Sequence, residues 1–203
     1  MITAVVALKG GVGKTTAAVY LALALAEGGD RVVLVDADRQ ASALHWADEY
    51  GGLGPTVFAV GGSTPEAMRS AVDLAGGSEV VIDTPPGDLR LVRAALSCAD
   101  VAIVPVRPTM LDLDRLDETL DLVRDAGIPA AILLNQVRVR TRSLAAARLA
   151  IDQLGLPLLE TAISAREAIA ASFGAAADPV ALGLYGAALS ELRSALPLLK
   201  ESR

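Results

Sequence analysis

Cysteine, lysine and aromatic residues are scarce in this 203-residue sequence, and it has no uninterrupted apolar run of membrane-spanning length. The single thiol, Cys98, cannot form an internal disulfide or supply a metal cluster, which fits a reducing cytoplasm. The missing apolar run argues against a membrane-spanning protein. With 3% aromatic residues, a stacking surface for single-stranded nucleic acid is not expected. The first residues, MITAVVALKGG, resemble a strand and lack the features of a secretory signal.

Acidic residues outnumber basic ones, and the net charge is −6. This balance argues against a protein that coats nucleic acid over its whole surface. Only three of the eighteen cationic residues are lysines, and Lys9 and Lys14 both fall in the stretch LKGGVGKTTA. Because lysine is rare elsewhere in the chain, the two lysines of this stretch are candidates for a functional role.

Short β-branched runs alternate with longer helical patterns along the whole chain. Such alternation predicts a single α/β domain over residues 1–203, with a mostly parallel twisted sheet of about seven strands and helices on both faces. The expected strands are Thr3–Leu8, Arg31–Val35, Thr56–Val60, Val80–Ile82, Val101–Val106, Ala130–Leu134 and Leu158–Ala162. The expected helices are Lys14–Gly28, Ser42–Tyr50, Pro65–Ala75, Leu89–Ala99, Leu111–Ala126, Ser143–Leu154 and Val180–Leu196.

The first strand leads into a glycine loop and then a long apolar helix. This arrangement predicts a phosphate-binding loop, because glycines let backbone N–H groups turn toward phosphate oxygens at a helix N-terminus. Lys14 would bind the β- and γ-phosphates of ATP, and the Thr15 hydroxyl would bind Mg²⁺. The loop residues expected to bind ATP from this pattern are Gly10, Gly11, Val12, Gly13, Lys14, Thr15 and Thr16.

Carboxylates follow two further strands. Asp36 and Asp38 come after the second expected strand, and Asp83 closes the fourth, in VVIDTPPG. Ligands of parallel sheets bind at the carboxyl ends of the strands, so these side chains should meet the phosphate loop. An aspartate that ends an apolar strand beside such a loop is expected to hold Mg²⁺ through water.

Together these motifs resemble the ParA/MinD group of P-loop ATPases, in its small form without an N-terminal DNA-reading domain. The resemblance rests on KGGVGKTT with its early lysine, on DADRQ with Arg39 where proline is usual, on DTPPG, and on later segments across nearly the whole chain. It implies catalytic roles for Lys9, which would reach the nucleotide of a partner subunit, for Lys14, and for Asp38, which would orient the attacking water. It places Asp36 near the metal and Asn135 at the adenine. The segment with Pro105, Arg107, Pro108 and Asp112 would lie near the dimer interface.

A local positive charge follows the sixth expected strand. Residues 126–151 contain no acid, yet they contain Arg138, Arg140, Arg142 and Arg148. This predicts salt-sensitive binding to duplex DNA of any sequence, and Arg166 and Lys200 are candidates to extend the patch. A solvated loop is the alternative interpretation. Pro197 should end the last helix and leave a tail too short for a membrane anchor.

The resemblance therefore implies a cytoplasmic, nucleoid-associated ATPase with ATP and Mg²⁺ as cofactors. It would form a homodimer on ATP, bind nonspecific DNA, and position a cargo with a ParB-like or other adaptor that stimulates slow hydrolysis. The cargo is plasmid, phage or chromosomal DNA, or a protein assembly. The alternatives are a MinD-like ATPase on a membrane surface and an ATP-dependent ligase of the dethiobiotin synthetase kind. An iron–sulfur reductase is excluded by the single cysteine.

Overall fold

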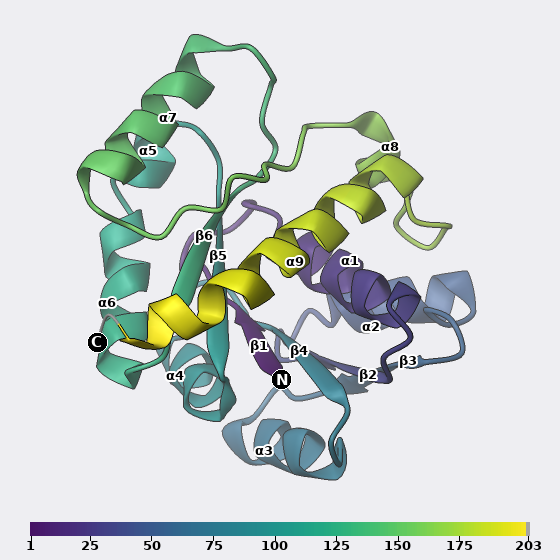
Figure 1. The fold of residues 1–203 in the computed structure, drawn as a ribbon. Helices are drawn as coiled ribbons and strands as arrows, with labels where there is room; N and C mark the ends of the chain where they lie inside the picture. Colours follow the sequence, from purple (N-terminus) through teal and green to yellow (C-terminus); the bar gives the residue numbers. More distant parts are fainter. Residues whose placement is uncertain (202–203) are drawn as a thin grey trace.

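A computed structural model describes residues 1–201, apart from the side chains of residues 198, 200 and 201. The described chain forms a six-stranded, all-parallel sheet in the order β3-β2-β4-β1-β5-β6 (Figure 1). The strands are β1 (Ile2–Val5), β2 (Val32–Asp36), β3 (Val57–Gly61), β4 (Glu79–Asp83), β5 (Val101–Val106) and β6 (Ala130–Leu134). β1 lies between β4 and β5, so the loop after it opens at the middle of the sheet edge.

Helices connect the strands and cover both faces of the sheet. They are α1 (Lys14–Glu27), α2 (Ser42–Tyr50), α3 (Pro65–Leu74), α4 (Leu89–Cys98), α5 (Met110–Leu113), α6 (Leu116–Ala126), α7 (Arg142–Gln153), α8 (Glu167–Ala171) and α9 (Pro179–Glu201). In Figure 1, α1 and the long α9 lie together in front of the sheet, and α3 and α4 lie toward its other side. The predicted α/β class and P-loop-type fold are confirmed.

The core has two faces because alternate residues of each strand point to opposite sides of the sheet. Val5, Leu34 and Val81 pack with α1, α2 and α9, whereas Ala4 and Ile82 pack with α3, α4 and α6. Strands buried on both faces need apolar residues at nearly every position, which explains their Val- and Ile-rich sequences.

The predicted seventh strand, Leu158–Ala162, is not a regular strand of the sheet. The chain there forms isolated parallel bridges with β6 at Leu158 and with Val137 at Ser164. Between these bridges the backbone N–H groups of Glu160 and Thr161 donate to the Glu191 carboxylate of α9. The ladder bond from the Leu159 N–H to the Ile132 carbonyl is therefore not followed by one from Thr161, and the Leu134 carbonyl accepts from the Ile163 N–H instead.

Two helix predictions also need correction. The expected helix Leu111–Ala126 is instead two helices: α5, whose start is capped by Thr109, and α6, which begins at the buried Leu116. Pro197 does not end the last helix: α9 continues through it to Glu201. The buried Leu192 anchors the preceding turn, and Pro197 itself is exposed, so the lost backbone hydrogen bond lies on the solvated side. No helix in the described part of the chain is long and apolar enough to cross a membrane.

Candidate functional site: a phosphate loop and an adjoining pocket

The loop between β1 and α1 has the geometry of an anion site. Gly11 and Gly13 have φ values of +75° and +87°, a left-handed conformation that strains other residues. α1 begins at Lys14 with no side-chain cap and no acid in its first turn, so its first N–H groups are open to a ligand. The loop therefore presents backbone donors and a helix dipole to the same space.

Lys14 and Asp83 lie beneath this loop. Lys14 is buried and its Nζ donates to the carbonyl oxygen of Lys9 at 3.0 Å. Burial lowers the pKa of Lys14, while Asp83 and Asp38 oppose that shift. Neither carboxylate oxygen of Asp83 has a hydrogen-bond partner among the described residues. Burial raises the pKa of Asp83 to about 7, against the opposing effects of the Thr15 hydroxyl and Lys14.

A fully buried carboxylate without a partner is costly, and a hydrated cation is a group that would satisfy it. Asp83 and Thr15 therefore fit Mg²⁺. No three carboxylate, imidazole or thiol groups come together as a metal site in residues 1–201.

Asp36 holds the start of α2. Its position is adjacent to Asp83 in the pairing of β2 with β4. Its Oδ2 accepts from the N–H groups of Ala43 and Leu44 at 2.9 and 3.1 Å, and its Oδ1 accepts from the N–H of Asp38 at 3.0 Å. The predicted metal ligand is thus the cap of a helix whose own N-cap residue offers no side-chain oxygen. Burial raises its pKa, and these three bonds oppose the rise.

Asp38 is half-buried in the loop that Asp36 holds, and its Oδ1 accepts from the N–H of Gln40 at 3.0 Å. It lies close enough to Lys14 and Asp83 to affect the pKa of both. Arg39, at the position where proline is usual, is exposed and does not pack in the core.

Lys9 points away from its own phosphate loop, into a network around Asp112. Its ammonium pairs with Asp112 Oδ1, while Arg107 Nε lies 2.8 Å from Asp112 Oδ2 and the Thr109 hydroxyl donates to the same oxygen at 2.7 Å. The Asp112 side chain has no exposed surface. Burial alone would raise its pKa, but the bonds from Arg107, Lys9 and Thr109 outweigh burial and lower the pKa to about 2.

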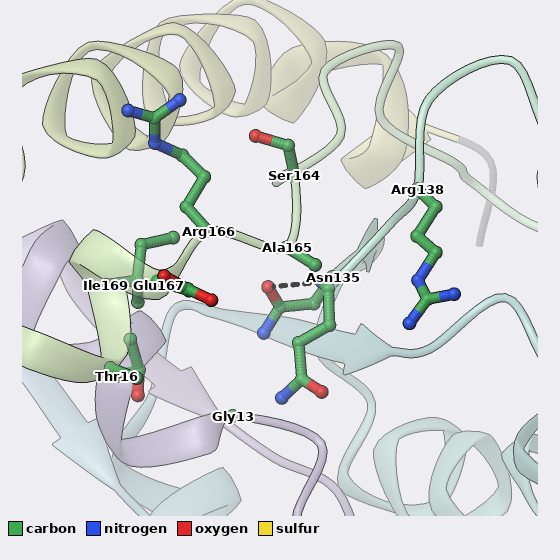
Figure 2. A pocket seen from close by; sticks show the side chains of 11 residues that line it. Gly13, Thr16, Asn135, Arg138, Ser164, Ala165, Arg166, Glu167 and Ile169 are labelled. Carbon is green, nitrogen blue, oxygen red and sulfur yellow. Dashed lines mark hydrogen bonds between the residues drawn. The ribbon is translucent and has the colours of Figure 1, made fainter.

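A pocket of about 570 Å³ opens beside the loop (Figure 2). Gly13 and Thr16 form its edge at the phosphate loop, and Asn135 lies at its centre. Asn135 Nδ2 donates to the carbonyl oxygen of Val12 at 2.8 Å, and its Oδ1 accepts from the N–H of Gln136. Asn135 therefore fastens the phosphate loop to the end of β6. A pocket of this size suits a nucleoside.

The opposite wall of the pocket was missed by the sequence prediction. Ser164, Glu167 and Ile169 line it, and Figure 2 shows Arg166 pointing away from the pocket centre. They fall between α7 and α9, where the sequence predicts a role for Arg166 alone. This wall lies near the phosphate loop only because of the tertiary fold. No local sequence pattern could therefore have placed it there.

The predicted DNA-contacting arginines separate into two groups. Arg148 donates to the Glu160 carbonyl at 2.6 Å and pairs with its carboxylate, and Arg166 pairs with Asp178 at 2.6 Å. Arg138, Arg140 and Arg142 are exposed and form no ion pair within the described chain. Arg138 and Arg140 lie between β6 and α7, and Arg142 begins α7; the three residues are called the arginine loop below. The side chain of Lys200 lies outside the described residues.

The chain is similar to known proteins. The CobQ/CobB/MinD/ParA nucleotide binding domain matches residues 3–179. The chain is 40% identical over 171 residues to the maintenance of carboxysome distribution protein A of Gloeobacter kilaueensis, covering 82% of this chain and 78% of that protein. It is 32% identical over 173 residues to the protein of the same name from Halothiobacillus neapolitanus, covering 80% and 79%.

The fold is also close to a solved structure, that of a plasmid partition protein of Borrelia burgdorferi B31 bound to AMPPNP. The TM-score is 0.77 at 19% identity, covering 95% of this chain and 98% of that one. At this identity the similarity supports the fold alone. The family match and the sequence relatives are what establish membership: the chain belongs to the ParA/MinD family of nucleotide-binding P-loop ATPases.

Proposed function

We propose that this chain is an Mg²⁺-ATP-dependent dimerising ATPase that binds duplex DNA without sequence preference and positions a cargo. A ParB-like or other adaptor would stimulate its hydrolysis. The observation that carries the proposal is the placement of Lys9, whose ammonium pairs with Asp112 and does not line the nucleotide pocket of its own chain.

A lysine on the outer side of a phosphate loop is available to a neighbouring subunit. Lys14 already occupies the inner position, where its Nζ reaches the loop backbone. Lys9 supplied to a second chain's triphosphate would neutralise charge that develops during phosphoryl transfer, as an arginine finger does. In this proposal Asp38 orients the attacking water, and Asp36 sets the position of Asp38 through the bond to its N–H.

The surroundings of Lys9 support a contact between two copies. Met110 and Leu111 are each 64% exposed and lie immediately before Asp112 in the chain. Exposed apolar side chains beside a charged network are typical of a surface that is covered in an assembly. ATP-dependent dimerisation would therefore bury these residues and move Lys9 from Asp112 to the partner's nucleotide.

The arginine loop supports the proposed DNA contact. Its three arginine residues are exposed, and a dimer would present two sets of them. Phosphate contacts of this kind bind DNA without reading its sequence and weaken steeply with salt. A nucleoid-associated location follows from this proposal. The carboxysome-distribution names of both relatives favour a protein assembly as the cargo over plasmid, phage or chromosomal DNA.

The test compares Lys9→Ala with Arg124→Ala, which removes an exposed cation that pairs with the nearby Asp121. Lys9→Ala should still bind ATP but should lose ATP-dependent dimerisation in sedimentation and ATP-dependent retention of random-sequence duplex DNA. Arg124→Ala should retain all three. Normal dimerisation of Lys9→Ala on ATP would contradict the proposed role of Lys9. ATP-dependent binding to anionic lipid vesicles in place of DNA would favour the membrane-surface alternative.

A further inference from the structure

A second large pocket lies between α1, α2 and the start of α9, and it is mainly apolar. It has a volume of about 620 Å³ and is called the apolar groove below. Its walls include Leu23 of α1, Trp46 and Tyr50 of α2, Leu53 of the next loop, and Leu182 of α9. It shares no lining residue with the nucleotide pocket or with the Lys9 network.

The edges of the groove expose large apolar side chains. Tyr50 is 46% exposed and Val180, which follows the lining residue Pro179, is 53% exposed. Phe173 is 50% exposed, and its ring lies 5.5 Å from that of Trp46. Contiguous apolar surface of this kind marks an interaction site more often than it occurs by chance.

The charge around the groove is acidic. Among the described residues that line it, Glu27 alone is charged, and Glu27 is exposed at the end of α1. Glu49 lies on α2 against Gly174 of the loop that borders the groove. Neither carboxylate has an ion-pair partner within the described residues. The complementary ligand is therefore an apolar side chain flanked by lysine or arginine.

The loop that borders the groove is also bonded to the nucleotide pocket. The Tyr20 hydroxyl of α1 donates to Ser172 Oγ and accepts from the N–H of Asp178, both at 2.9 Å. The Asp178 carboxylate holds Arg166, which belongs to the wall of the nucleotide pocket. A ligand in the groove would thus contact a segment that also supports the nucleotide site.

We propose that the apolar groove docks a short segment of a partner protein that carries apolar anchors flanked by basic residues. This segment would belong to the adaptor, so the inference rests on the proposed function for its biological role. The groove lies on elements other than the Lys9 network, which leaves it open for the adaptor when two copies meet through that network.

Trp46 is the only tryptophan of the chain and lines the groove, so its fluorescence reports occupancy directly. The probe is a short amphipathic peptide of leucine and lysine, compared with the same peptide carrying glutamate in place of lysine. The basic peptide should change the Trp46 emission saturably, and the acidic peptide should not. No saturable response to the basic peptide, or an equal response to the acidic one, overturns the proposal.

Two variants locate the binding. Glu27→Lys reverses the charge that lines the groove, and Tyr50→Ser removes an exposed aromatic side chain from its wall. Each variant should weaken binding of the basic peptide by about tenfold or more. Asp73→Lys is the matched control, because it makes the same charge change at an exposed site in the last turn of α3. An equal loss of peptide affinity in Asp73→Lys would show a general charge effect and would contradict binding in the apolar groove.

The same peptide should change the rate at which a fluorescent ADP analogue leaves the wild-type protein, and not the rate for Glu27→Lys. An unchanged wild-type rate contradicts the link to the nucleotide pocket. Peptide binding is measured without nucleotide or DNA, so its failure is distinguishable from failure of ATP-dependent dimerisation and DNA retention, which would overturn the proposed function instead.

Discussion

Replacement of Asp112 by asparagine should destabilise the folded protein by about 2 to 3 kcal/mol at neutral pH. The pKa of Asp112 is lowered from 3.8 to about 2, and a shift of that size corresponds to this free energy. The side chain has no exposed surface, so solvent screening is small. Asparagine keeps the shape and some hydrogen bonds but loses the charge that Lys9 and Arg107 neutralise.

The assay is urea unfolding of the wild-type protein and of Asp112→Asn. The control is Asp121→Asn, which breaks an ion pair whose two side chains are 63% and 64% exposed and should change stability by less than about 0.5 kcal/mol. Because the folded pKa of Asp112 is lowered, its contribution is complete above about pH 4 and is lost as the pH falls through about 2. A loss of stability for Asp112→Asn no larger than that of the control would refute the reasoning.

Two further predictions concern ligands. Gly13→Ala should weaken ATP binding at least tenfold in calorimetry, because a Cβ there would lie 2.5 Å from Asn135 Nδ2. In the control Gly11→Ala the added Cβ meets no atom within 4 Å, so only a modest effect of the positive φ is expected. Equal losses of affinity in the two variants would contradict this account. Arg140→Ala should lower the slope of the logarithm of DNA affinity against the logarithm of salt concentration by about one, the amount expected for one phosphate contact. Arg148 is already paired within the chain, so Arg148→Ala should leave that slope unchanged.

Local sequence patterns were enough to predict the six regular strands and the position of the phosphate loop. Strand ends of a parallel sheet share one edge, so Asp36, Asp83 and the loop after β1 could be placed together from the order of elements alone. The prediction of a seventh strand was wrong because the bonding of that segment depends on a distant part of the chain. The hydrogen bonds of Glu160 and Thr161 go to Glu191, about thirty residues away in the chain.

Site roles were less predictable than site positions. The resemblance places Asp36 near the metal, which stays a prediction, and the structure adds a role that the sequence does not show: its carboxylate caps α2. Arg148 and Arg166 are attractive as phosphate contacts in the sequence, yet each meets an acid twelve residues further on. The Lys9–Asp112 pair joins residues about one hundred positions apart, so only the structure reveals it.

The most direct measurement is a crystal structure of the protein with Mg²⁺ and a non-hydrolysable ATP analogue. The account predicts two chains facing each other, with each Lys9 ammonium released from Asp112 and placed against the other chain's phosphates. A nucleotide-bound single chain in which Lys9 still pairs with Asp112 would contradict it.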